Sequence, residues 1–175
     1  MSAADAVMWA LDRNWEMIEA ALQGLDDAVL TRRPAPHSNS IAWTMWHLSR
    51  GIDTFINTRL QGKTASWGSD GWYRQFGMKE DVRGMGWTEA DLDAWTPPPM
   101  QAQLAYYEAM KTDARRYISS LSAADLDRRV TFPPEAQTQD HTLATALGQL
   151  VFENVAHGGQ IAYLRGFFQG MGWHR

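Results

Sequence analysis

Hydrophobic residues recur every three or four positions in four long stretches of the chain, which is the period of an amphipathic helix. We expect these helices to cover about residues 8–25, 41–60, 100–121 and 143–170. No stretch gives a strong strand signal. The pattern therefore predicts an all-α fold, a four-helix bundle, in a single domain over residues 1–175. The apolar stripes consist of Met8, Leu11, Trp15, Ile18, Leu22 and Leu25; Ile41, Met45, Leu48, Ile52 and Phe55; Tyr107, Met110, Ala114, Tyr117 and Leu121; and Leu143, Leu147, Leu150, Ile161, Leu164 and Phe168.

Short polar residues indicate where these helices begin. One of the residues 38–40 (Ser-Asn-Ser) can cap the second helix, and Thr142 can cap the fourth, by accepting a hydrogen bond from a free backbone amide. The run from Ser122 to Asp125 has the pattern of a capping box and predicts a further short turn. A loop around Pro133-Pro134 separates that turn from the fourth helix.

The connection over residues 61–98 is unusually long for a compact domain. It is rich in Gly, Trp, Asp and Pro, and only short helical turns such as Thr88 to Trp95 fit its pattern. Connections of this length usually carry a function or are disordered. Its aromatic residues favour a packed lid, and we expect a long crossover between helices two and three. These residues are Trp67, Trp72, Tyr73, Phe76, Trp87 and Trp95.

Composition and charge limit the classes of molecule that this chain can bind. The formal net charge is −4 and the 16 Lys and Arg are scattered, so the chain lacks the basic footprint of a nucleic-acid-binding protein. No apolar run approaches the roughly 18 residues that cross a bilayer, and no secretory signal opens the sequence. There is no cysteine, which excludes disulfides and thiolate metal sites. We expect a cytoplasmic protein that acts on a small molecule, away from nucleic acid and membranes.

The fourth helix has polar residues at positions where its apolar stripe predicts Leu or Ile. Asn154 and His157 occupy stripe positions, and Glu153 and Gln160 lie beside them. Because a buried charge or imidazole is costly unless it is paired or bound to a metal, these residues need an explanation. Glu153 and His157 are four apart and share a helical face, which suits two ligands of one ion. Gln160 and Asn154 would orient these ligands without touching the ion themselves. A surface ion pair and a hydrogen-bonded core histidine are the alternatives.

A third ligand must come from another helix, and His47 is the best candidate. His141 lies roughly 18 Å from Glu153 along the helix at about 1.5 Å per residue, and His174 is next to the chain end. His37 belongs to a loop. Only His47 lies in the middle of a predicted helix, at a depth comparable with that of the other two ligands, although it stands at the flank of its stripe.

Three segments carry a resemblance to the DinB/YfiT-like family. One segment resembles the family's second-helix signature, another its fourth-helix motif His-x-x-x-His-x-Gly-Gln, and the last a crossover element of one subgroup. They are Ser38-Asn39-Ser40-Ile41-Ala42-Trp43 with Trp46-His47-Leu48, then Glu153-Asn154-Val155-Ala156-His157-Gly158-Gly159-Gln160-Ile161, and Gly71-Trp72-Tyr73-Arg74-Gln75-Phe76-Gly77. The likeness covers essentially the whole chain. It implies a four-helix bundle with three metal ligands, usually three histidines, facing a cleft.

At one ligand position this chain has Glu153 where most members have histidine. A set of His47, Glu153 and His157 is similar to that of the mycothiol-dependent maleylpyruvate isomerases, whose extra C-terminal domain we do not find here. We expect one divalent metal ion, zinc first, with nickel or iron as alternatives, because two histidines and a carboxylate also suit non-haem iron.

The resemblance further implies a thiol-dependent transferase that joins a low-molecular-weight thiol, such as mycothiol or bacillithiol, to an electrophilic small molecule. A metal-dependent hydrolase and a non-catalytic metal-binding or stress-related interaction module are the alternatives, and the catalytic residues are unknown. A homodimer is expected, since exposed aromatic residues and bundle faces favour two-fold pairing. The candidates for the substrate pocket are Trp43, Trp46, Arg50, Trp72 and Tyr73.

Overall fold

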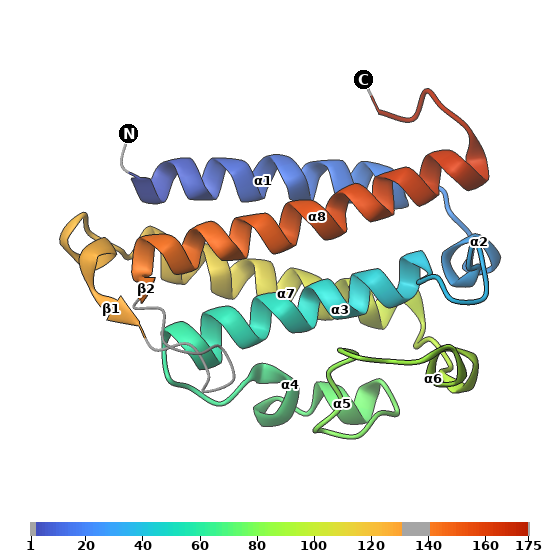
Figure 1. Ribbon diagram of the computed structural model, residues 1–175, viewed down its shortest axis with the longest axis horizontal. Helices are drawn as coiled ribbons and strands as arrows, with labels where there is room; N and C mark the ends of the chain where they lie inside the picture. Colours follow the sequence, from blue (N-terminus) through green and yellow to red (C-terminus); the bar gives the residue numbers. More distant parts are fainter. Residues whose placement is uncertain (1–2, 131–140, 175) are drawn as a thin grey trace.

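The computed structural model describes residues 3–130 and 141–174. Within them, four long helical rods lie side by side as a bundle (Figure 1). The rods are α1 (Ala3–Leu22), α3 (Ile41–Asp53) with its π-helical continuation η1 (Thr54–Leu60), α7 (Met100–Ser119) and α8 (Leu143–Gln169). Helix α8 packs against both α1 and α3, and α7 packs against α3 and α1. The predicted all-α four-helix bundle is confirmed.

The helix starts confirm the predicted caps. Ser40 Oγ accepts a hydrogen bond from the amide of Trp43 at 3.2 Å, and Thr142 Oγ1 accepts one from Thr145 at 3.3 Å. Ser122 and Asp125 exchange reciprocal bonds at the start of the 3₁₀ turn η2 (Ala124–Asp127). Because each bond satisfies an amide that the helix leaves unpaired, helix starts could be read from the chain alone.

The long crossover contains three short helices, α4 (Ser66–Ser69), α5 (Trp72–Gln75) and α6 (Glu89–Ala94), and a further short helix, α2 (Asp27–Thr31), follows α1. Trp67 and Phe76 are buried against the core, and Trp72, Trp87 and Trp95 are partly buried on it. The aromatic residues of this segment therefore fix it to the bundle as a packed cover. In Figure 1 it lies below α3, on the side away from α1.

Two short strands depart from the expectation that the chain has none of any strength. Strands β1 (Arg129–Val130) and β2 (His141–Thr142) pair antiparallel, with Arg129 opposite Thr142 and Val130 opposite His141. Two-residue strands are too short to leave a periodic signal. The predicted loop around Pro133-Pro134 lies outside the described residues. No described helix has the length and apolar character needed to cross a membrane.

Candidate metal centre

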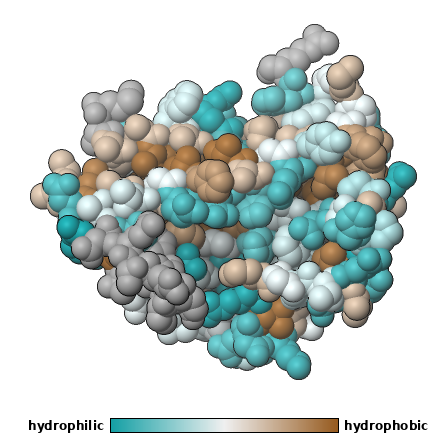
Figure 2. All heavy atoms as spheres, viewed as in Figure 1, coloured by the Kyte–Doolittle hydropathy of each residue, from teal (hydrophilic) through white to brown (hydrophobic). Residues whose placement is uncertain are grey.

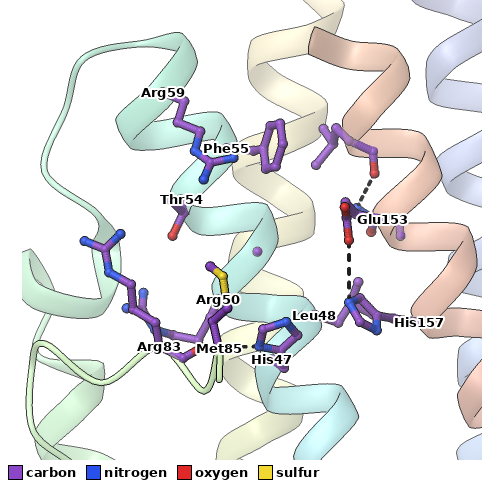
Figure 3. A pocket seen from close by; sticks show the side chains of 13 residues that line it. His47, Leu48, Arg50, Thr54, Phe55, Arg59, Arg83, Met85, Glu153 and His157 are labelled. Atoms are coloured by element: carbon purple, nitrogen blue, oxygen red, sulfur yellow. Dashed lines mark hydrogen bonds and ion pairs between the residues drawn. The ribbon is translucent and has the colours of Figure 1, made fainter. Parts of the chain in front are cut away.

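The three predicted metal ligands line one cavity between α3 and α8. His47 comes from α3, and Glu153 and His157 come from the facing side of α8 (Figure 3). The imidazole centroids of His47 and His157 are 5.1 Å apart, with the rings nearly perpendicular, and Glu153 Oε2 lies 3.8 Å from His157 Nε2. The cavity has a volume of about 370 Å³. Its other lining residues are Leu48, Arg50, Gly51, Thr54, Phe55, Arg59, Arg83, Met85, Leu150 and Asn154.

Both histidines use Nδ1 for a hydrogen bond to a protein oxygen. Nδ1 of His47 lies 3.2 Å from the carbonyl oxygen of Arg83, and because a carbonyl only accepts, Nδ1 carries the proton. Nδ1 of His157 donates to Oε1 of Gln160 at 3.0 Å. When either ring is neutral with its proton on Nδ1, Nε2 keeps its lone pair, which is the usual arrangement of metal-ligating histidines. Gln160 thus contacts a predicted ligand, and its support of a bound ion stays a prediction.

Electrostatics keep His47 neutral. Burial lowers the pKa of His47 below its ordinary value, and the nearby imidazole of His157 lowers it further. The hydrogen bond to Arg83 and the charge of Glu153 oppose this shift without reversing it. A neutral imidazole is the form that binds a metal ion, so His47 needs no deprotonation at neutral pH.

The residues fit a divalent ion in their chemistry. Across residues 3–130 and 141–174, no three His, Asp or Glu side chains already stand close enough to hold an ion. Two imidazoles and one carboxylate nevertheless line the same cavity, a donor set that suits zinc or a related cation. Gln149 donates to Glu153 Oε1 at 2.8 Å and helps to orient this carboxylate.

The buried Asn154 sets the rotation of α8 about its axis. Its Oδ1 accepts from Trp15 Nε1 at 3.2 Å, its backbone oxygen accepts from Asn14 Nδ2 at 2.8 Å, and its own amide donates to Leu150. Asn154 was predicted to support a metal ligand directly. Its polar atoms bond to α1 and to its own helix instead, so it acts on Glu153 and His157 by holding the helix that carries them.

The predicted substrate-pocket residues divide into two groups. Arg50 lines the cavity, whereas Trp43, Trp46, Trp72 and Tyr73 do not. Trp43 stacks on His47 with centroids 4.7 Å apart, Trp46 is fully buried, and Trp72 packs on Tyr106. The large indole faces of the three tryptophans are taken up by core contacts, since they gain more free energy by burial than by lining an open cavity.

Several lining residues were not found from the sequence. Arg83 and Met85 come from the crossover, and no spacing rule relates them to His47. Phe55 and Arg59 belong to the π-helical segment η1, in which the wider turn changes which side chains share a face. The spacing of Arg59 from His47 gave no signal either, because twelve residues are about three and a third α-helical turns and would place the two side chains on different faces.

Comparison with known proteins decides the family. The family model described as "DinB superfamily" matches residues 10–161. The chain belongs to the DinB superfamily. Among solved structures, this DinB-superfamily chain is similar to a conserved protein from Enterococcus faecalis, with a TM-score of 0.82 and 24% identity over 98% of this chain and 99% of that one. This likeness supports the fold alone. No curated protein matches the chain closely enough to count as a relative.

Proposed function

We propose that this DinB-superfamily protein is a divalent-metal-dependent enzyme that joins a low-molecular-weight thiol, of mycothiol or bacillithiol type, to an electrophilic small molecule in the cytoplasm. The supporting observation is that Nδ1 of both His47 and His157 is hydrogen-bonded to a protein oxygen, which leaves each Nε2 without a hydrogen bond to the backbone, and that Glu153 lines the same cavity. These three residues would hold the ion, with zinc proposed first and nickel or iron next. When bound, such an ion makes a thiolate available at neutral pH by lowering the pKa of the thiol.

The opposite wall of the cavity favours an anionic ligand. Arg50, Arg59 and Arg83 line the side away from Glu153 and His157 (Figure 3). Leu48, Phe55 and Leu150 give the same cavity apolar surface. Cationic side chains with low-dielectric walls attract anions, so we expect one reactant to carry a carboxylate or another anionic group on a partly apolar body.

The lining also favours thiol transfer over hydrolysis. Of the described residues that line the cavity, Glu153 is the only carboxylate. If Glu153 holds the ion, it cannot also act as the general base that a hydrolase needs to activate water. A thiol whose pKa has been lowered attacks as the thiolate and does not depend on such a base.

The metal site is tested by His157→Ala. Removing one of three ligands should lower bound metal at least about tenfold while the helices remain, since the remaining ligands bind an ion far more weakly. Elemental analysis measures the metal and far-ultraviolet circular dichroism measures the helices. His37→Ala is the matched control, because His37 is exposed in a loop outside the cavity. Unchanged metal content in His157→Ala would refute the assignment.

The reaction is tested on the purified metal-loaded protein with mycothiol or bacillithiol and the electrophile monochlorobimane. We expect fluorescent conjugate at a rate that a chelator abolishes and that the same metal restores. Bound metal without conjugate formation from either thiol would contradict the transferase and favour a non-catalytic metal-binding module.

A further inference from the structure

Arg50 is a buried cation held from three sides, one helical turn after His47. Only 5% of the residue is exposed. Its guanidinium carbon lies 4.6 Å from the ring centroid of Trp67, Nη1 lies 3.8 Å from Asp53 Oδ2, and Nη2 donates to the carbonyl oxygen of Val82 at 3.3 Å. Two of these contacts, those with Trp67 and Val82, reach into the crossover. Arg50 therefore connects α3 to two separate parts of that segment.

Asp53, the carboxylate beside this guanidinium, is itself held by several donors. It is fully buried, and it accepts hydrogen bonds from the amides of Ser66 and Trp67 at 2.9 and 2.8 Å and from the hydroxyl of Tyr106 at 2.7 Å. A buried carboxylate with this many donors is held tightly, because leaving any of its lone pairs unmet would cost free energy. The guanidinium of Arg50 therefore lies between a fixed negative charge and the face of Trp67.

The backbone that Arg50 contacts at Val82 also contacts His47. The next carbonyl along the chain, that of Arg83, is the acceptor for Nδ1–H of His47. Two successive carbonyls of the crossover are thus bound by two residues of α3 that stand one turn apart. A neutral imidazole takes its tautomer from the hydrogen bond that one nitrogen makes, so the position of this short backbone segment decides which nitrogen of His47 is free.

We propose that Arg50 is a positioning residue for His47. By holding the carbonyl of Val82, it keeps the carbonyl of Arg83 at His47 Nδ1 and so leaves Nε2 with its lone pair toward the cavity. The consequence for metal binding rests on the proposed function, whereas the tautomer of His47 is a property of the metal-free protein. The guanidinium adds positive charge to the cavity wall, and its contacts with Val82 and Trp67 are made to the crossover.

The tautomer is measured by NMR on isotope-labelled, metal-free protein at about pH 8, above the ordinary pKa of histidine. In the wild type we expect His47 to carry its proton on Nδ1 alone. In Arg50→Met, which keeps an apolar side chain but loses the donor, we expect a mixture of both tautomers at His47 and an unchanged His157. Arg59→Met is the control, because it removes a cation from the same cavity and leaves the bond between Arg50 and Val82 in place.

Metal affinity is the second measurement. Supporting contacts of metal-bound histidines typically change affinity by about 10–100-fold, so Arg50→Met should bind zinc at least about tenfold more weakly than the wild type. If Arg50→Met does not fold, Arg50→Lys serves in its place, since an ammonium cannot stack on Trp67 and reach Val82 at once. His47 held on Nδ1 alone in the folded variant would overturn the proposal. If the wild type binds no metal but Arg50→Met still shows the tautomer change, the metal site is refuted and the role of Arg50 stands.

Discussion

At the residue scale, Asp53 joins the bundle to its crossover. The carboxylate lies at the end of α3 and accepts from residues 57, 66, 67 and 106, which belong to η1, α4 and α7. Burial and the adjacent carboxylate of Asp53 raise the pKa of Tyr106 well above its ordinary value, which keeps the hydroxyl protonated as a donor. This cluster joins the crossover to α3, the helix that carries His47.

We predict that Tyr106→Phe lowers the free energy of unfolding by about 1.5–3 kcal/mol, because it removes a hydrogen bond to a buried charge. Urea denaturation at neutral pH measures this. The comparison is Phe55→Leu, in which a buried aromatic residue with no hydroxyl is replaced by an aliphatic one, with an expected loss below about 1.5 kcal/mol. Equal losses in the two variants would contradict the role of the hydroxyl.

The raised pKa of Tyr106 also predicts a difference at high pH. In the unfolded chain the tyrosine titrates near about 10, whereas in the folded protein it keeps its proton to higher pH. Its contribution is therefore fully present below about pH 10 and is lost as the pH rises toward the folded-state value. The free energy of unfolding should fall less steeply above about pH 10 in Tyr106→Phe than in the wild type. Urea denaturation at a series of pH values measures this free energy in both proteins. The same slope above about pH 10 in the wild type and in Tyr106→Phe would contradict the prediction.

At the element scale, α1 and α8 approach closely at Gly158, one residue after the ligand His157. A Cβ atom at this glycine would overlap Asn14 Oδ1 and lie 2.9 Å from Asn14 Cγ, and Asn14 is itself bonded to the backbone of Asn154. A side chain at this position of α8 therefore has no room unless Asn14 gives up its place between the two helices.

We predict that Gly158→Ala destabilises the protein by about 1–3 kcal/mol, because an added methyl group in a packed interface forces the helices apart. The same shift should weaken metal binding through His157. Gly159→Ala is the matched control: its Cβ would meet nothing within 4 Å, and alanine favours a helix over glycine by about 1 kcal/mol. Thermal unfolding and metal titration of both variants measure the effects. A Gly158→Ala protein as stable as Gly159→Ala would show that the close approach is unimportant.

At the scale of the whole molecule, an apolar stripe on α8 remains exposed. Phe152 and Tyr163 are 64% and 69% exposed, and Val155 and Phe167 lie on the same side of the helix. Figure 2 shows hydrophobic residues gathered over the region of α1 and α8. The stripe spans residues 152–167, roughly 22 Å at 1.5 Å per residue, and its members carry no charge. A second copy can lie on it without charge repulsion, which fits the homodimer expected from the sequence.

We predict that the wild type sediments as a dimer and that Tyr163→Glu sediments as a monomer at the same concentration, because a carboxylate in a two-fold interface meets its own symmetry mate. Thr112→Glu, on the exposed side of α7, is the control and should remain dimeric. Analytical ultracentrifugation decides between the two states. A monomeric wild type at tens of micromolar would contradict the dimer.

The four long helices, the caps of α3 and α8 and the shared face of Glu153 and His157 could be predicted from the amino-acid sequence. These features are local: a helix repeats every 3.6 residues, a cap is met within three positions, and residues four apart share a face whatever surrounds them. His47 could be proposed as the third ligand because the other histidines were excluded by their positions along the chain.

The way in which the crossover lies on the bundle could not be predicted from the sequence and is known from the three-dimensional fold. In the fold, the carbonyl of Arg83 lies at His47 and Arg50 contacts Val82 and Trp67, whereas Trp72 and Tyr73 do not line the cavity. The π-helical turn after Asp53 likewise left no mark on the hydrophobic pattern. These outcomes depend on contacts between residues far apart in the chain, whose free energies are set by packing and buried hydrogen bonds, and no short-range period in the sequence records them.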